Sequence, residues 1–76
     1  MAEENDFNMT PVSSSQIAAV GFNAATSQGR VEFNNGSLYE YDGCTQAEAD
    51  SIINASSVGI AFSTTWKGTK PFRRIS

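Results

Sequence analysis

An Asn-Asn-Gly turn between two alternating segments constrains the fold of this chain more than any other feature. Residues 30–33 alternate apolar Val31 and Phe33 with charged side chains, which is the period of a half-buried strand. The turn at residues 34–36 follows, because Asn and Gly tolerate the positive φ that tight turns need. Residues 38–41 alternate again and return as a second strand. The segment therefore predicts an antiparallel hairpin.

The segments on either side of the hairpin extend it into an α+β domain. Residues 16–22 are a short apolar run typical of a strand, and the polar residues 23–29 predict the loop that joins it to the hairpin. After the hairpin, Thr45 and Glu48 have the spacing of a helix capping box. These patterns predict a three-stranded antiparallel meander followed by two short helices and an extended C-terminal segment. The helices are expected over residues 46–55 and 60–66, and the extended segment over residues 70–75.

A chain of 76 residues is long enough for one domain. Residues 1–10 are polar and acidic without periodicity, so they are predicted to be a disordered tail, and residues 11–76 to be the folded domain. A domain of this length buries only ~60% of the surface that its unfolded chain exposes. We therefore expect it to form a homo-oligomer, which would bury more apolar surface.

The composition excludes several kinds of chemistry. The chain has no histidine, so it lacks the commonest general base and any Ser-His or Cys-His pair. Cys44 is the only cysteine, and the acidic residues show no metal-ligand spacing. We predict no catalytic residues, no metal and no cofactor, and hence a protein that is not an enzyme. The lack of a ~20-residue apolar run and of a leader sequence predicts no membrane association, and the cysteine usage suits a cytoplasmic location.

Basic and aromatic residues gather at the C-terminal end. Four of the five basic residues lie in the last ten positions, although the whole chain has a net charge of −3. Aromatic faces stack on nucleobases, and Lys and Arg bind phosphates, so this end is the first candidate binding site. The candidate contact residues in this segment are Trp66, Lys67, Lys70, Arg73 and Arg74.

Two other polar groups are candidates for the same site. Ser13 and Ser14 precede the first strand, where they satisfy backbone groups in a turn or donate to phosphate oxygens. Tyr39 and Tyr41 share one face of the third strand and have hydroxyls available to a ligand. A purely structural alternative stays open for the C-terminal end. Under this alternative, the basic side chains only neutralise the negative charge of the surrounding surface. The segment then packs onto the sheet through Trp66, Phe72 and Ile75.

Four stretches of the sequence resemble the KTSC domain family. They are residues 12–22 (VSSSQIAAVGF), 33–41 (FNNGSLYEY), 55–62 (ASSVGIAF) and 66–75 (WKGTKPFRRI), so the resemblance covers about residues 11–76. It implies a small domain that occurs at the C-terminus of some lysyl-tRNA synthetases and as a stand-alone protein of bacteria and phages, with no established reaction. The family's recurring positions correspond here to Ser14, Ile17, Gly21, Phe22, Gly36, Tyr39, Tyr41, Ser57, Gly59, Phe62, Phe72 and Arg74. Phe22 and Phe72 stand where Tyr is expected, which removes two hydroxyls from any shared polar site.

These observations predict a non-enzymatic binding module, encoded by a phage or a bacterium, that holds a small phosphorylated ligand such as a nucleotide or a cyclic dinucleotide. Tight binding without chemistry would sequester that ligand from a host defence pathway. Two alternatives stay open: an accessory domain that binds RNA or single-stranded nucleic acid, and an inhibitor that docks on a host enzyme. The acidic net charge disfavours long-range attraction to nucleic acid, and a charged fraction of only 17% disfavours a DNA mimic.

Overall fold

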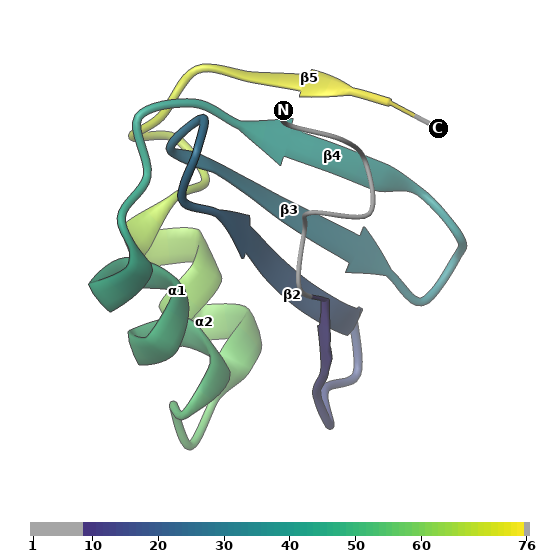
Figure 1. Cartoon of the computed structure of the whole chain (residues 1–76). Helices are drawn as coiled ribbons and strands as arrows, with labels where there is room; N and C mark the ends of the chain where they lie inside the picture. The colour runs from purple at the N-terminus through teal and green to yellow at the C-terminus, as the bar shows by residue number, and fades with distance from the viewer. Residues whose placement is uncertain (1–8, 76) are drawn as a thin grey trace.

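An antiparallel sheet with two helices on one face makes up residues 9–75, the part of the chain that the computed structural model describes (Figure 1). The helices α1 (Gln46–Ile53) and α2 (Val58–Thr65) lie between the last two strands in the chain. Each strand pairs with the strand that precedes it, in the order β1 (Thr10–Pro11), β2 (Ile17–Asn23), β3 (Gln28–Phe33), β4 (Leu38–Tyr41) and β5 (Phe72–Arg74). The α+β class is confirmed.

The sheet is larger than the predicted three-stranded meander, because a further strand lies at each edge. Thr10 in β1 pairs with Val20, and Arg73 in β5 pairs with Glu40. The C-terminal segment was expected to be extended, and the edge of β4 gives its backbone groups hydrogen-bond partners. Of the acidic tail predicted over residues 1–10, residues 1–8 lie outside the described residues, whereas Thr10 belongs to the sheet.

The predicted hairpin is confirmed as β3, a turn and β4. Phe33 N–H donates to the carbonyl of Ser37 at 2.8 Å, and Gly36 N–H donates to the carbonyl of Phe33 at 2.9 Å. Gly36 has a φ of +93°, which a side chain would make costly. The turn therefore has the residue type that its backbone requires.

Both helices begin at a hydroxyl cap. The predicted capping box is confirmed: Glu48 N–H donates to Thr45 Oγ1 at 3.2 Å, and Thr45 N–H donates to Glu48 Oε1 at 3.0 Å. The second helix begins at Val58, two residues earlier than expected, because Ser57 Oγ accepts a hydrogen bond from Ile60 N–H at 3.4 Å. No helix in residues 9–75 is long and apolar enough to cross a membrane.

The core lies between the sheet and the helices, and Trp66 is its largest fully buried side chain. The indole ring lies directly against the backbone of Gly29 in β3. A Cβ atom at Gly29 would stand 2.3 Å from Trp66 Cη2, closer than real carbon atoms approach. Glycine at this position thus lets the residue that follows α2 pack flat on the sheet.

Candidate ligand-binding groove

Five aromatic rings line a groove on the helix-covered side of the sheet. The rings form a closed circuit in the order Phe33, Tyr39, Phe72, Tyr41 and Phe62. Their successive centroid separations are 5.5, 5.8, 5.7, 5.5 and 5.7 Å, with the last step returning to Phe33. The groove has a volume of about 780 Å³, which is the size of a pocket for a small molecule.

Strand periodicity explains why these rings converge. Tyr39 and Tyr41 are two residues apart on β4, so both point to the helix side, whereas Glu40 points to the opposite face. Phe72 pairs with Tyr41 across the β4–β5 ladder and therefore shares its side. Tyr41 is only 3% exposed and forms the floor, whereas Phe72 is 59% exposed and forms an accessible wall.

Polar groups surround the aromatic walls. Lys67 and Gly68 border the groove just after α2, and Asn34, Asn35 and Ser37 border it at the β3–β4 turn. Lys67 makes no ion pair with any other residue in 9–75, so its ammonium group is available to an anion. This rim provides hydrogen-bonding groups and one positive charge around an apolar floor.

The hydroxyl of Tyr41 is a further polar group of the groove. It makes no hydrogen bond to the described residues, although the ring beneath it is buried. Burial, followed by the charges of Tyr39 and Cys44, raises the pKa of Tyr41 to about 12. The hydroxyl is therefore protonated at neutral pH and can donate to a ligand.

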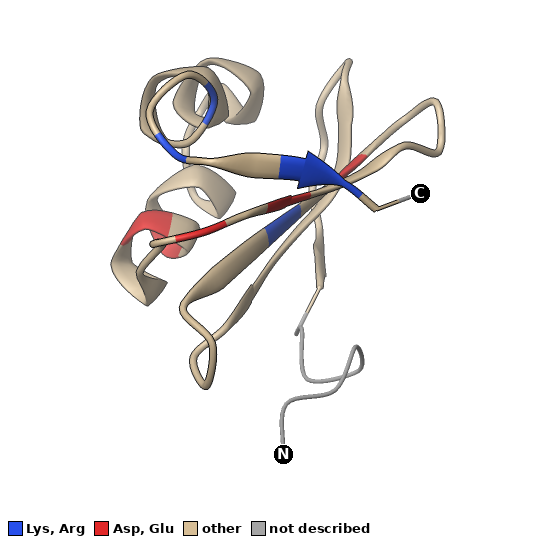
Figure 2. Ribbon diagram, turned by 90° about the horizontal axis from the view of Figure 1, so that it is seen from above, with Lys and Arg blue, Asp and Glu red and all other residues tan. Residues whose placement is uncertain are grey.

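The other basic side chains of the C-terminal end lie outside the groove lining. Arg73 forms ion pairs with Glu40 and, at 3.6 Å, with Asp42, on the sheet face opposite the helices. Glu40 also pairs with Arg30, with 3.1 Å between Arg30 Nε and Glu40 Oε2. Figure 2 shows the resulting alternation of basic and acidic positions across β5, β4 and β3. Arg74 also interacts within the protein.

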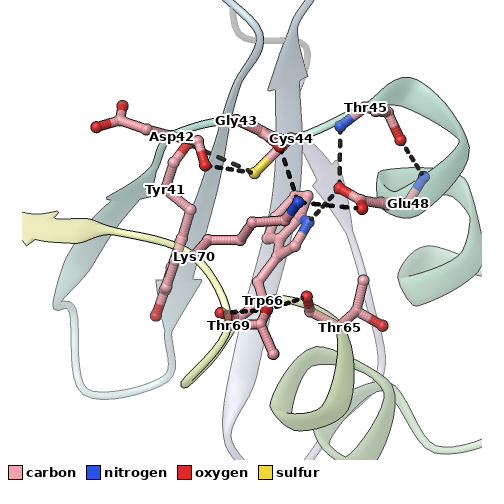
Figure 3. A network of polar contacts seen from close by, with 10 residues as sticks. All are labelled: Tyr41, Asp42, Gly43, Cys44, Thr45, Glu48, Thr65, Trp66, Thr69 and Lys70. Atoms are coloured by element: carbon pink, nitrogen blue, oxygen red, sulfur yellow. Dashed lines mark hydrogen bonds and ion pairs between the residues drawn. The ribbon is translucent and has the colours of Figure 1, made fainter.

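Trp66 and Lys70 belong to a network centred on Glu48 (Figure 3). Trp66 Nε1 donates to Glu48 Oε1 at 3.3 Å, and Lys70 Nζ lies 3.3 Å from Glu48 Oε2 while donating to the carbonyl of Gly43 at 2.9 Å. Trp66 is fully buried and stacks on Tyr41 with centroids 5.9 Å apart. The structural alternative is therefore confirmed for Trp66, which has no surface to offer a ligand.

That alternative holds only in part for the two other apolar residues of the segment. The ring of Phe72 packs against Tyr39 and Tyr41 but stays 59% exposed, and Ile75 is 39% exposed. Within residues 9–75, no further strand pairs with the outer edge of β5 to cover these side chains. The exposed part of Phe72 contributes a wall of the groove.

Ser13 and Ser14 lie at a second, smaller hollow of about 420 Å³, beside the start of α2. Ser14 Oγ accepts hydrogen bonds from Gln16 N–H at 3.2 Å and from Ile17 N–H at 3.3 Å, which confirms the predicted turn at Ser14. None of the four basic residues of the C-terminal end lines this hollow. The structure thus separates the serines from the cations with which they were grouped.

The sequence pattern missed Phe33, Phe62 and the turn amides of Asn34 and Asn35 as site residues. Phe33 was assigned to a strand face, and its turn was considered only for its backbone. The signal that was available is the alternation of β3 and β4, which places Phe33 on the same face as Tyr39. Phe62 reaches this face only because α2 folds back over the sheet.

The remaining groups with reactive chemistry do not converge on the groove. Burial is the main cause that raises the pKa of the Cys44 thiol to about 11, so it is protonated at neutral pH. Its sulfur lies 3.5 Å from the carbonyl of Tyr41. Within residues 9–75 there is no cluster of three His, Cys, Asp or Glu side chains that could hold a metal ion. The arrangement therefore supports binding by stacking and hydrogen bonds.

Glu48 is expected to make the stability of the domain depend on acidity. Partial burial raises the pKa of its carboxyl, but hydrogen bonds from Thr45, Trp66 and Lys70 outweigh burial and hold the pKa below its ordinary value of 4.5. A lowered pKa contributes stability that is complete above the ordinary value and is lost as the pH falls through the folded one. Urea unfolding from pH 6 to pH 3 should therefore show a decline that is smaller in Glu48→Gln. Equal declines in the two proteins would contradict this role.

Fold and groove together define a small α+β domain with an aromatic groove on the helix-covered side of its sheet. The chain belongs to the KTSC domain family, whose model matches residues 13–69. It is similar to a KTSC domain protein of Yersinia pestis, whose crystal structure superimposes with a TM-score of 0.84 at 28% sequence identity, over 92% of this chain and 99% of that one. No curated protein matches the sequence.

Proposed function

We propose that this domain is a non-enzymatic binding module whose aromatic groove holds a nucleotide or another small phosphorylated ligand with a planar ring. The observation that carries the proposal is the circuit of five rings beside the available ammonium group of Lys67. A base stacked on an aromatic side chain contributes ~1–3 kcal/mol by alanine substitution. Lys67 supplies the positive charge that a phosphate requires, and Tyr41 adds a neutral donor.

The position of the cations favours a small ligand over a nucleic-acid strand. Proteins that bind single strands follow the backbone with a basic groove. Here Lys70 and Arg73 form ion pairs with acidic residues of the domain, and among the described residues that line the groove Lys67 is the one with a basic side chain. One ammonium group matches one phosphate better than a chain of them.

Isothermal titration calorimetry tests the proposal. Titrations with AMP, GMP, a cyclic dinucleotide and inorganic phosphate are expected to show binding for at least one nucleotide and weak binding for phosphate alone. Phe72→Ala should weaken the nucleotide about tenfold, the equivalent of ~1.4 kcal/mol, because it removes an accessible wall of the groove. Lys67→Ala should weaken it to a similar degree, and Lys67→Arg should restore most of the affinity because it keeps the charge.

Ile60→Ala is the matched control. Ile60 is 67% exposed, as large and apolar as a groove residue, and lies outside the groove lining. Its truncation should leave nucleotide affinity unchanged. Affinity weaker than about 1 mM for every nucleotide, ~4 kcal/mol, would overturn the proposal.

A binding affinity that decreases steeply with salt concentration would instead favour nucleic acid as the ligand. Self-association stays a prediction, and light scattering on the same samples measures it.

A further inference from the structure

The β3–β4 turn presents two side-chain amides at the rim of the aromatic groove. Asn34 and Asn35 both line the groove, next to the ring of Phe33. Each amide carries a donor end and an acceptor end, and each uses one end on the protein itself. The end that is left over determines what the turn can offer a ligand.

Asn34 offers an acceptor. Its Nδ2 group donates to the backbone carbonyl of Ser14 at 3.0 Å, which orients the amide. Its Oδ1 atom makes no hydrogen bond to the described residues. A carbonyl oxygen in this position can accept a hydrogen bond from a ligand N–H.

Asn35 offers a donor. Its Oδ1 atom accepts a hydrogen bond from Ser37 N–H at 3.0 Å, which reverses the orientation found at Asn34. Its Nδ2 group makes no hydrogen bond to the described residues and can donate to a ligand. Adjacent residues of the turn therefore expose one acceptor and one donor.

The turn holds these amides in place. The turn has hydrogen bonds within the hairpin and one to a neighbouring segment. Asn34 N–H donates to the carbonyl of Gln16 at 2.8 Å, which connects the turn to the segment before β2. Backbone and side-chain bonds thus anchor Asn34 to the segment of Ser14 and Gln16. Groups oriented before the ligand arrives lose little entropy on binding.

We propose that Asn34 and Asn35 read one hydrogen-bonding edge of a purine base that stacks in the groove, with Asn34 Oδ1 accepting from the base and Asn35 Nδ2 donating to it. This inference rests on the proposed binding of nucleotides and adds the chemical class of the base. Adenine presents a neighbouring donor and acceptor on its edges, as does guanine on its Watson–Crick edge. A purine without exocyclic groups presents acceptors only.

Calorimetry with purine riboside 5′-monophosphate tests the inference, because this base lacks every N–H donor. We expect it to bind the wild-type protein about tenfold more weakly than AMP or GMP, whichever binds more tightly. In Asn34→Ala the acceptor is gone, so the ratio of the two affinities should fall close to one. Stacking and the phosphate contact are the same for both ligands, so the ratio isolates the edge of the base.

Asn35→Asp provides a second variant that keeps the turn intact. Aspartate retains the Oδ1 acceptor for Ser37 N–H and replaces the exposed Nδ2 donor by an acceptor. It should bind the preferred nucleotide, AMP or GMP, more weakly than wild type does. If that nucleotide is GMP, the acceptor that Asn35 contacts is O6. If it is AMP, the 1-deaza and 7-deaza analogues of AMP, which lack one ring acceptor each, reveal which nitrogen Asn35 contacts. In wild type one of the two should bind several-fold more weakly than AMP, and in Asn35→Asp that difference should vanish.

The outcomes separate this inference from the proposed function. Nucleotide binding with equal affinity for AMP, GMP and purine riboside 5′-monophosphate would overturn the reading by the turn and leave the groove intact. A preference for AMP or GMP over purine riboside 5′-monophosphate that is the same in Asn34→Ala and Asn35→Asp as in wild type would also overturn the inference. Absence of nucleotide binding would overturn both proposals, and the thermal midpoints of the variants distinguish this result from a failure to fold.

Discussion

Replacing Trp66 by alanine is expected to lower the free energy of unfolding by about 3–5 kcal/mol. The indole is fully buried, stacks on Tyr41 and donates to Glu48, so truncation leaves a cavity and removes one of the hydrogen bonds to Glu48 Oε1. A domain of this size has a stability on the order of 4–11 kcal/mol. The variant should therefore unfold at a much lower urea concentration than the wild-type protein at 25 °C, as measured by urea titration followed by circular dichroism.

Two other variants sharpen this expectation. Phe72→Ala removes a comparable ring from an exposed position in the same segment and should cost less than about 1 kcal/mol. Gly29→Ala should cost about 1–3 kcal/mol, because the added methyl group would overlap the indole ring of Trp66. Wild-type stability in Trp66→Ala would show that the ring does not pack on β3 as described.

Replacing Glu40 by glutamine is expected to destabilise the domain by about 2–4 kcal/mol. The Glu40 side chain is only 5% exposed and forms ion pairs with Arg30 and Arg73. Glutamine removes the negative charge of Glu40, so both guanidinium groups lose the carboxylate that they share. The value lies below that of a fully buried pair because the Arg73 side chain is 56% exposed. Chemical denaturation of the purified variant measures it.

Glu32→Gln is the matched control for the loss of one carboxylate. Glu32 is exposed on the same face of the sheet and makes no ion pair with residues 9–75. We expect its substitution to change stability by less than about 0.5 kcal/mol. If both variants lost the same stability, net charge rather than the Glu40 pairs would be the cause.

Glu40 also connects stability with the groove. Its pair with Arg73 holds β5 on the sheet, and β5 carries Phe72, which forms an accessible wall. Arg73, first considered a ligand contact, is thus placed where it supports the site from the opposite face. Through this ion pair Arg73 helps to position a wall of the groove from the other face of the sheet.

Membership of the KTSC family supports the fold and identifies no ligand. The candidate site therefore depends on the side chains of this chain, above all the aromatic circuit, Lys67 and the turn amides. Lys67 was among the residues singled out from the sequence, as were Tyr39 and Tyr41. Phe33, Phe62, Asn34 and Asn35 were recognised only in the structure.

Local interactions are what the sequence by itself determined. The turn of the β3–β4 hairpin, the α1 capping box and the turn at Ser14 each depend on residues no more than four positions apart, so a short window contains the whole cause. Strand alternation likewise predicted that Tyr39 and Tyr41 share a face.

Only the tertiary structure decided which distant segments meet. The pairing of β5 with β4, the ion pair of Arg73 with Glu40 and the approach of Phe62 to Phe33 join residues about 30 positions apart. Such contacts depend on how the whole chain packs, and no local pattern encodes them. The proposed binding face is accordingly the aromatic groove rather than the basic C-terminal segment beside it.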